Sequence, residues 1–330
     1  MSSQPKTLIT PQIGASRTNT RESFLAYAFI LPAAIPLLLF SLYPIAAVFF
    51  GSFFKDVDTQ TPHFVGLANF DAVLGGREFW HSLLVTVYYV LGVAPVAIIL
   101  SFLIATLLHQ NILARGMYRT AFFLPYVTST VAAASIFRWI FGISQRSVAN
   151  IVFNWFGLPQ QGWVQEPRGI FELIANHFGA TEFPLWAAGP SLALCCVIVF
   201  SIWHMLGFNI VVFLAGISAI SRDVYEAADV DGANWWQKTR YITLPLLSPT
   251  MFFLLIISVI RSFQSFNDIY ILTPVERTNS TQNLVLLIVS KMREGGDYGF
   301  ALAVSFILFL IIMGLTLAQV RLFERQVHYQ

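Results

Sequence analysis

Six long apolar segments, separated by polar stretches, dominate the pattern along the chain. They cover about residues 24–50, 81–108, 120–141, 190–220, 250–272 and 300–320. A helix that crosses the hydrocarbon core of a membrane needs about 20 apolar residues. The pattern therefore predicts an all-α integral membrane protein with six transmembrane helices.

The polar stretches predict how the rest of the chain is organised. Residues 1–22 are rich in Ser and Thr and lack the apolar core of a signal peptide, so they predict a flexible N-terminal tail before a transmembrane domain at 23–330. The long outer loop 142–189 separates the third and fourth spans. Within it, the apolar residues of 170–178 recur near helical spacing, which predicts a short helix lying on the outer membrane surface.

The composition agrees with a membrane location. Of the 330 residues, 56% are hydrophobic and only 11% are charged, and the mean hydropathy is +0.68. A soluble domain carries about a quarter of its residues as Asp, Glu, Lys and Arg, so most of this surface is expected to face lipid. The net charge of +2 is too small to favour nucleic acid as a partner.

Lys and Arg residues set the expected orientation. If the N-terminus is inside, the inner segments carry more Lys and Arg than the outer ones, and the short loop between the second and third spans holds Arg115 and Arg119. Cytoplasmic loops are enriched in these residues, so both termini are predicted to be cytoplasmic.

The inner loop between the fourth and fifth spans has the pattern of two short helices joined by a bend. Asp223 with Glu226 forms a capping pair that opens the first helix, and Gly232 suits the left-handed turn that ends it. Asn234 with Gln237 opens the second helix in the same way. From these residues alone, a docking element for another protein and a plain amphipathic connector are equally good interpretations.

The same loop resembles that of a known family, the binding-protein-dependent ABC importer permeases. Its residues match the EAA loop of that family at every fixed position and spacing: Glu226, Ala227, Ala228, Gly232, Ile242, Leu244 and Pro245. The stretches 64–70, 119–126, 206–210 and 213–220 are similar to the sugar-type branch, which includes the maltose and glycerol-3-phosphate permeases. The resemblance covers roughly residues 25–325.

This resemblance implies a fold and a role. The implied fold is the six-helix permease with a cytoplasmic coupling helix in the loop 221–245, where Glu226, Ala227, Ala228 and Gly232 contact an ATPase subunit. The implied role is that of a non-catalytic translocation subunit of the bacterial inner (plasma) membrane. Such a subunit imports a sugar or related carbohydrate by alternating access.

The resemblance also implies partners. They are ATP-binding subunits, expected as a dimer, a second permease that is a related but different chain, an extracytoplasmic solute-binding protein, and membrane lipid. The chain lacks the Gly-x-x-x-x-Gly-Lys-Ser/Thr loop of an ATPase. ATP and Mg²⁺ are therefore expected on the partner ATPase, and no cofactor or metal is expected on this chain.

Polar residues inside two spans are candidates for the substrate path, since polar groups in a membrane are costly without a function or a partner. The predicted path consists of Asn209, Phe263, Gln264, Asn267, Asp268 and Tyr270. On a continuous fifth helix, Phe263, Asn267 and Tyr270 would share one face. Amide and aromatic groups suit the hydroxyls and C–H faces of a sugar, and the resemblance to the maltose permease places the region around Phe263, Gln264 and Asn267 on the path. Hydrogen bonding between helices is the alternative role for the amides.

Other functions remain open at this point. Arg261 in the fifth span either neutralises an anionic substrate, which would favour glycerol-3-phosphate or another polyol derivative, or pairs internally with Asp268. An ion-coupled secondary transporter is an alternative from another class, but it leaves the EAA loop unexplained. A membrane enzyme is disfavoured because the six His residues show no metal-ligand spacing.

Overall fold

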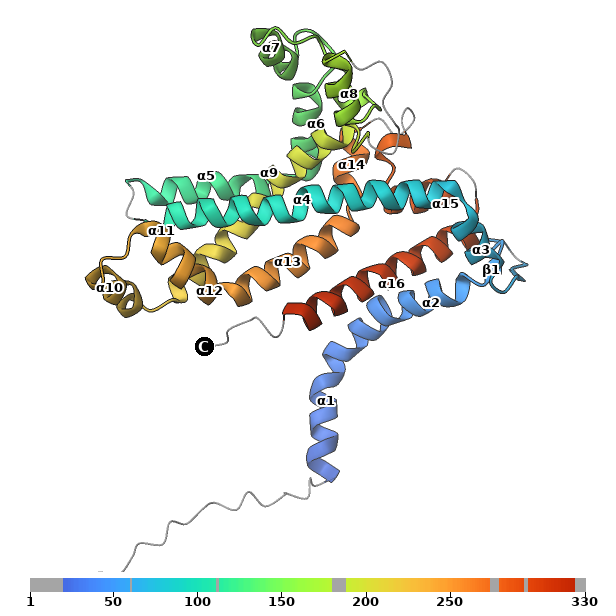
Figure 1. The fold of residues 1–330 in the computed structure, drawn as a ribbon. Helices are drawn as coiled ribbons and strands as arrows, with labels where there is room; N and C mark the ends of the chain where they lie inside the picture. Colours follow the sequence, from blue (N-terminus) through green and yellow to red (C-terminus); the bar gives the residue numbers. More distant parts are fainter. Residues whose placement is uncertain are drawn as a thin grey trace, which may run out of the picture. The chain divides into compact units, whose positions relative to one another are not determined.

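The structure, a computed structural model, describes residues 20–59, 61–110, 113–179, 188–273, 279–293 and 296–323. Residues 1–19 of the predicted tail at 1–22 lie outside the described residues. The first helix begins at Thr20, within the last part of that predicted tail. The chain forms two compact units, Met1–Phe50 and Gly51–Gln330 (Figure 1).

The N-terminal unit is a run of apolar helix. It consists of α1 (Thr20–Leu37), the π-helical turn η1 (Leu38–Leu42) and α2 (Tyr43–Gly51). Pro44 lacks the amide hydrogen that would bond the carbonyl four residues earlier in an α-helix, and the widened turn η1 lies directly before it. Residues Tyr27–Gly51, 25 in number, are apolar and long enough to cross a membrane, as predicted for the first span.

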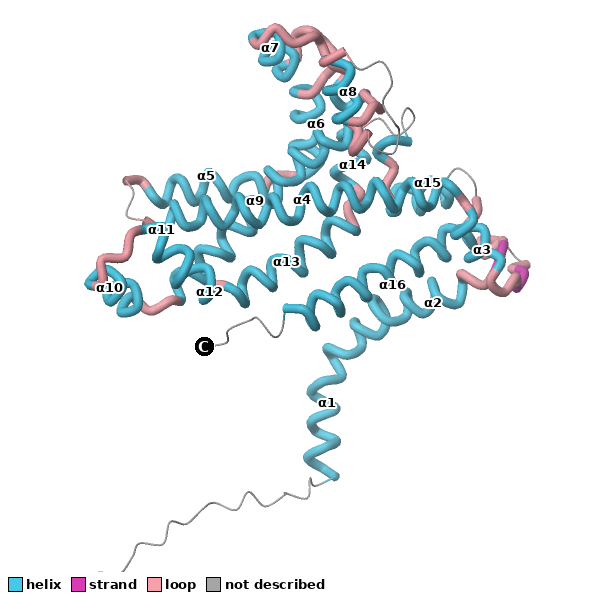
Figure 2. Tube along the Cα trace, in the orientation of Figure 1, coloured by secondary structure: helices cyan, strands magenta, loops and turns pink. Residues whose placement is uncertain are grey.

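In its described residues, the second unit consists of helices, the loops between them and one short antiparallel pair of strands, β1 (Phe54–Lys55) and β2 (His63–Phe64) (Figure 2). Its described helical elements are, in chain order, α3 (Ala68–Gly75), α4 (Arg77–His109), α5 (Arg115–Val127), α6 (Thr130–Ile140), α7 (Val148–Trp155), η2 (Trp163–Gln165), α8 (Ile170–His177), α9 (Leu192–Ala219), α10 (Arg222–Val230), α11 (Trp235–Lys238), η4 (Thr239–Thr243), α12 (Leu244–Leu246), α13 (Ser248–Phe263), α14 (Asn267–Leu272), η5 (Asn279–Thr281), α15 (Leu284–Arg293) and α16 (Tyr298–Phe323).

Three of these helices are long and apolar enough to cross a membrane alone. They are α4 with 33 residues, α9 with 28 residues, and α16 over Tyr298–Leu322. Two bent pairs qualify as further spans: α5 and α6 meet at 96°, and Trp235–Leu246 meets α13 at 68°. With the N-terminal span, the described residues offer up to six spans, and the predicted all-α membrane fold is confirmed.

The third and fifth spans were predicted as continuous helices, and that prediction is wrong. α5 ends where Pro125 removes an amide donor and the Thr128 hydroxyl donates to the Leu124 carbonyl at 2.8 Å. α13 ends at Phe263, and the next helix, α14, begins only at Asn267. Hydropathy shows that a segment is apolar, but it does not record whether the backbone bends.

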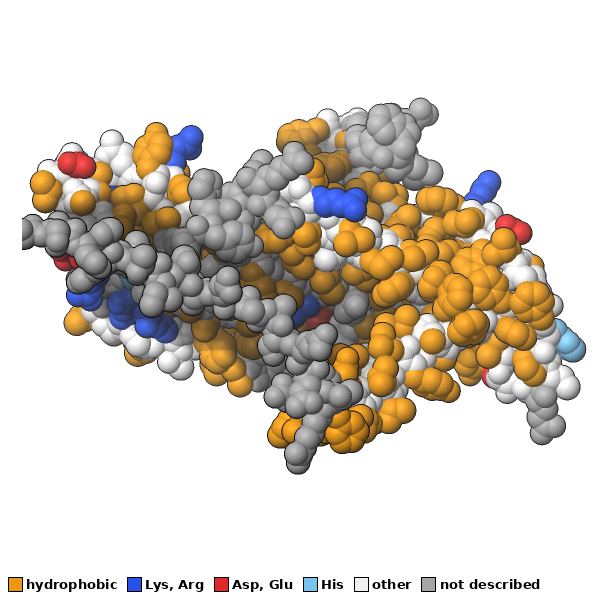
Figure 3. Space-filling view, turned by 90° about the horizontal axis from the view of Figure 1, so that it is seen from below, with side chains coloured by type: hydrophobic (Ala, Val, Ile, Leu, Met, Phe, Trp, Pro, Cys, Tyr) orange, Lys and Arg blue, Asp and Glu red, His pale blue; other side chains and the backbone are white. Residues whose placement is uncertain are grey.

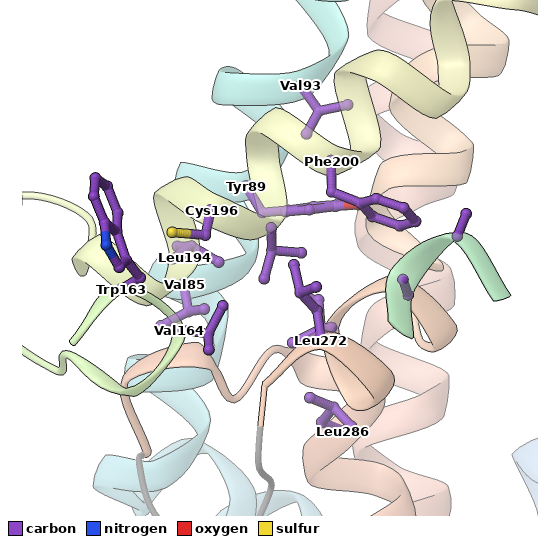
Figure 4. Packing of buried hydrophobic residues seen from close by; sticks show 14 residues of the cluster. Val85, Tyr89, Val93, Trp163, Val164, Leu194, Cys196, Phe200, Leu272 and Leu286 are labelled. Carbon is purple, nitrogen blue, oxygen red and sulfur yellow. The ribbon is translucent and has the colours of Figure 1, made fainter. Parts of the chain in front are cut away.

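The helices α4 and α9 form the centre of the second unit, with α5 packed on α9 and α13 packed on α4 (Figure 1). One buried cluster joins α4, η2, α9, α14 and α15, and includes Tyr89 and Phe200 (Figure 4). A second joins the other halves of α4 and α9 to α13, and a third joins α3, α4, the end of α13, α15 and α16. At Gly207 on α9 a Cβ would lie only 2.9 Å from the carbonyl oxygen of Phe122, so α5 and α9 pack backbone against backbone.

The segment predicted as the long outer loop, 142–189 (called the outer segment below), contains more structure than predicted. The helix α8 confirms the predicted helix within 170–178, while its position on the membrane surface stays a prediction. The helix α7 was not predicted; Ser147 caps it by accepting from the Asn150 amide at 3.4 Å. The Asn150 side chain accepts in turn from Trp163 Nε1 at 2.8 Å, which fixes the turn after α7.

Candidate functional site

A cavity of about 240 Å³ lies where the helix is interrupted between α13 and α14. Several elements supply its walls: Tyr89 comes from α4, Tyr126 from α5, Ser201 and His204 from α9, and Arg261 from α13. The interruption itself, Gln264, Ser265 and Phe266, completes the lining together with the first two residues of α14. The cavity is therefore lined largely by polar side chains and bordered by helices that belong to several spans.

A hydrogen-bond network centred on Tyr89 holds this interruption against α4 and α9. The Tyr89 hydroxyl lies 2.8 Å from Ser201 Oγ, 3.0 Å from Ser265 Oγ and 3.2 Å from Asp268 Oδ2. The Ser201 hydroxyl donates to Asp268 Oδ2 at 3.0 Å. In a membrane, such groups are stable only when they pair inside the protein.

Asn283 fixes the interruption from the other side. Its Nδ2 donates to the Ser265 carbonyl at 2.6 Å, and its Oδ1 accepts from the Leu286 amide at 2.9 Å at the start of α15. The next amide, that of Leu284, donates to Thr86 Oγ1 on α4 at 3.0 Å. A carbonyl freed by the helix break thus has a fixed donor, so the break is a built feature of the fold.

Arg261 is held by aromatic rings. Its guanidinium carbon lies 4.9 Å from the ring centre of Phe208 and 5.9 Å from that of Tyr126, which is cation–π geometry. Among the described residues no ion pair joins it to Asp268, so the structure does not support internal pairing with Asp268, one of the two alternatives for this residue. The helix break separates Arg261 from Asp268, and the Asp268 carboxylate accepts hydrogen bonds from Tyr89 and Ser201 instead.

The second candidate site is the loop between α9 and α13. α10 begins after Ser221, whose side chain accepts from the Asp223 amide at 3.3 Å. It ends in a left-handed turn at Gly232, where φ is +75°. The Gly232 amide donates to the Asp229 carbonyl and the Ala233 amide to the Ala228 carbonyl, which is the Schellman motif.

The α11 helix opens with a capping box. Asn234 Oδ1 accepts from the Gln237 amide at 2.9 Å, and Gln237 Oε1 accepts from the Asn234 amide at 2.7 Å. Lys238 Nζ lies 2.6 Å from Asp229 Oδ1, so an ion pair ties α11 to α10. The loop therefore forms a helical hairpin between α9 and α13, held by local caps and by this ion pair.

Comparison with known proteins identifies this arrangement. Residues 72–328 match the family described as binding-protein-dependent transport system inner membrane component. The chain belongs to this family of ABC importer permeases. It is 32% identical over 302 residues to the arabinooligosaccharides transport system permease protein AraP of Bacillus subtilis (strain 168), covering 90% of this chain and 87% of that protein. It is 30% identical to the trehalose/maltose transport system permease protein MalF of Thermococcus litoralis (strain ATCC 51850 / DSM 5473 / JCM 8560 / NS-C), covering 93% and 96%.

The fold of the permease is also found in a solved structure. A chain in the crystal structure of a bacterial ABC transporter involved in the import of the acidic polysaccharide alginate superposes with a TM-score of 0.73. The two chains are 22% identical, and the match covers 92% of this chain and 96% of that one. The chain is thus a sugar-type ABC importer permease, a non-catalytic component of the inner membrane.

The structure brings together only half of the residues predicted for the substrate path of the permease. Gln264, Asn267 and Asp268 line the cavity. Phe263 is buried in the cluster with α15 and α16, and Asn209 is buried away from the cavity lining. The predicted face common to Phe263, Asn267 and Tyr270 is broken, because α13 ends at Phe263 and only Asn267 and Tyr270 lie together, three residues apart, in α14.

Tyr270 instead stacks on Phe266, with ring centres 5.0 Å apart, and its hydroxyl accepts from Arg293 Nη1 at 3.3 Å. Sequence reasoning also missed Tyr89, Tyr126 and Ser201, which were counted only as parts of apolar spans. For Ser201 a signal existed, since it precedes His204 by one helical turn and therefore shares its face.

In the coupling loop, the local predictions fare better. The capping pair at Asn234 and the left-handed turn at Gly232 are confirmed. The predicted capping by Asp223 is wrong, because Ser221 takes the capping position and Asp223 lies within the first turn of α10. Glu226 and Ala227 are exposed and Ala228 faces inward, and the role of these residues and Gly232 as ATPase contacts stays a prediction.

Proposed function

We propose that this permease carries a sugar or related carbohydrate across the membrane by alternating access, through the cavity between α13 and α14. The observation that carries the proposal is the chemistry of that cavity: an amide from Asn267, an amide from Gln264 and a carboxylate from Asp268 beside aromatic rings. Asp268 Oδ1 has no hydrogen-bond partner among the described residues and is able to accept from a substrate hydroxyl. Rings such as Phe266 suit the C–H face of a sugar.

The proposed energy source is ATP hydrolysis by partner subunits. A dimer of ATP-binding subunits would hold ATP and Mg²⁺ and would contact the loop at Glu226, Ala227, Ala228 and Gly232. An extracytoplasmic binding protein would deliver the solute, a second, related permease chain would complete the pathway, and both termini would face the cytoplasm. The family description and the helical hairpin of α10 and α11 support this assembly.

Gentle purification from the native membrane, followed by identification of the co-purified chains and of the ligand on the binding protein, tests the assembly and identifies the substrate. Uptake of that substrate into vesicles then tests the cavity. Asn267→Ala should weaken substrate affinity about 2- to 12-fold, which corresponds to one lost hydrogen bond of about 0.5–1.5 kcal/mol. Asn154→Ala, an exposed position on α7, is the control and should leave affinity unchanged. Equal affinities in the two variants would exclude this cavity from the path.

A second candidate is an anionic substrate such as glycerol-3-phosphate or another polyol derivative. Arg261 favours it, because the guanidinium lines the cavity and makes no ion pair with a described carboxylate. Arg261→Gln should abolish uptake of an anionic substrate but reduce uptake of a neutral sugar only modestly. The identity of the co-purified ligand decides between the two.

A further inference from the structure

A larger cavity, of about 730 Å³, lies at the other end of the second unit, beside the coupling loop. Its walls come from the last turns of α4 and α9, the first turns of α5, and the helices α10, α11 and η4. Figure 3 shows Lys and Arg side chains gathered at the end of the molecule where α10 and α11 lie (left in Figure 1). Of its lining residues, the proposed transport cycle uses only Glu226, as an ATPase contact.

Three arginines converge on the cavity. Arg115 and Arg119 come from the start of α5, and Arg222 comes from the start of α10. His109 at the end of α4 joins them, with its Nδ1 3.4 Å from Arg115 Nη2. Three guanidinium groups at one cavity repel one another unless an anion lies between them.

The carboxylates on the lining do not neutralise these arginines. Asp229 is paired with Lys238 at 2.6 Å. Glu226 also lines the cavity, but among the described residues no ion pair within 4.0 Å joins it to an arginine. Arg115 Nε and Arg119 Nε are buried and have no hydrogen-bond partner in the described part of the chain. Two guanidinium nitrogens of cavity-lining arginines are therefore unpaired among the described residues.

The helix ends add to this charge. Arg115 is the first residue of α5, which has 13 residues, and Arg222 is the first residue of α10, which has nine. The N-terminus of a helix carries a partial positive charge and unpaired amides, which favour phosphate groups. Planar guanidinium groups bind phosphate oxygens in pairs.

We propose that this cavity binds a phosphate group, bridging α5 and the coupling helix α10. The cavity lies at the ends of apolar spans, where phospholipid headgroups lie, and basic pockets at this depth bind anionic headgroups. A soluble phosphate compound offers the same chemistry. The inference rests on the proposed function in one respect: the proposed function decides on which side of the membrane the loop, and therefore the cavity, lies.

The test uses the purified importer complex in detergent. Native mass spectrometry measures binding of phosphatidylglycerol and of phosphatidylcholine, and thermal unfolding measures the effect of inorganic phosphate. In the double variant Arg119→Gln/Arg222→Gln, binding of the phosphate-bearing probe should weaken roughly tenfold or more. The matched control is Arg240→Gln, a basic residue of the same loop that does not line the cavity.

Preferential binding of phosphatidylglycerol over phosphatidylcholine, lost in the double variant and kept in the control, would identify a lipid headgroup. Stabilisation by inorganic phosphate that is lost in the double variant, without a preference between the lipids, would identify a soluble phosphate compound. Equal binding of both probes by wild type and double variant would overturn the proposal. Should the double variant fail to assemble, the exposed single variant Arg222→Gln gives the same comparison. Binding is measured without transport, so a failed uptake assay does not affect the result.

Discussion

The packing of α5 on α9 can be tested at Gly207. A Cβ at this position would lie 2.9 Å from the Phe122 carbonyl oxygen, 3.0 Å from Tyr126 Cβ and 3.2 Å from the Phe123 carbonyl oxygen. Two of these atoms belong to backbone, so the helices must move apart to accept even a methyl group. Overpacking of this kind costs about 1–3 kcal/mol. Alanine also favours the helix by about 1 kcal/mol over glycine, which partly hides the cost.

Gly314 supplies a matched control, because it is also inside a helix, α16, and a Cβ there would meet nothing within 4 Å. The helix preference is the same in both variants, so the difference between Gly207→Ala and Gly314→Ala isolates the overpacking. We expect Gly207→Ala to be less stable than Gly314→Ala by about 1–3 kcal/mol in denaturant unfolding in the same detergent. Since Tyr126 lines the cavity, substrate affinity should fall as well. Equal stability of the two variants would show that α5 and α9 do not pack in this way.

Three further predictions follow from single contacts. Gly232→Ala should lower the free energy of unfolding by about 1–2 kcal/mol because of its φ of +75°, and it should weaken co-purification of the ATPase. The control Gly157→Ala, with φ +70° in the outer segment, should carry similar strain and leave assembly intact. Tyr89→Phe should lower the free energy of unfolding by about 1–3 kcal/mol, because three polar groups lose their shared partner; unchanged unfolding would show that the network does not stabilise the fold. The hydrogen bond from Arg168 lowers the pKa of the Glu166 carboxyl below its ordinary 4.5, so the pair stabilises the outer segment above pH 4.5 and is lost as the pH falls through the lowered pKa. Amide hydrogen exchange of the outer segment should therefore accelerate in the wild type as the pH falls through this pKa. The same acceleration in Arg168→Gln would show that another titrating group causes it.

The coupling loop was predictable because its structure is decided locally. The capping box at Asn234 and the turn at Gly232 depend on residues within four positions of each other, and such signals survive in the sequence. The one error, Asp223 for Ser221, arose because two good capping residues lie two positions apart, and either would start a helix.

The cavity was less predictable because it depends on tertiary contacts and on a helix break. Tyr89 lies more than a hundred residues from Ser201 and from Asp268, so no local pattern connects them. Nothing in the hydropathy of 250–272 distinguishes a continuous helix from one interrupted at 264–266. At the break, Asn283 supplies the Ser265 carbonyl with a hydrogen bond that a continuous helix would have made itself, and Tyr89 holds the Ser265 side chain.

The two sites share their supporting helices. α9 carries Ser201 and His204 at the cavity and leads directly into α10, and the loop then returns into α13, which carries Arg261 to the same cavity. From Ser201 to the end of α9 at Ala219 the helix rises about 27 Å, at about 1.5 Å per residue. A Cβ at Gly216 would lie 2.7 Å from Leu247 Cδ2 and 2.9 Å from Thr250 Oγ1, so α9 and α13 are packed closely near the loop. Under the proposed cycle, a displacement of the hairpin would therefore reach both walls of the cavity along these two helices.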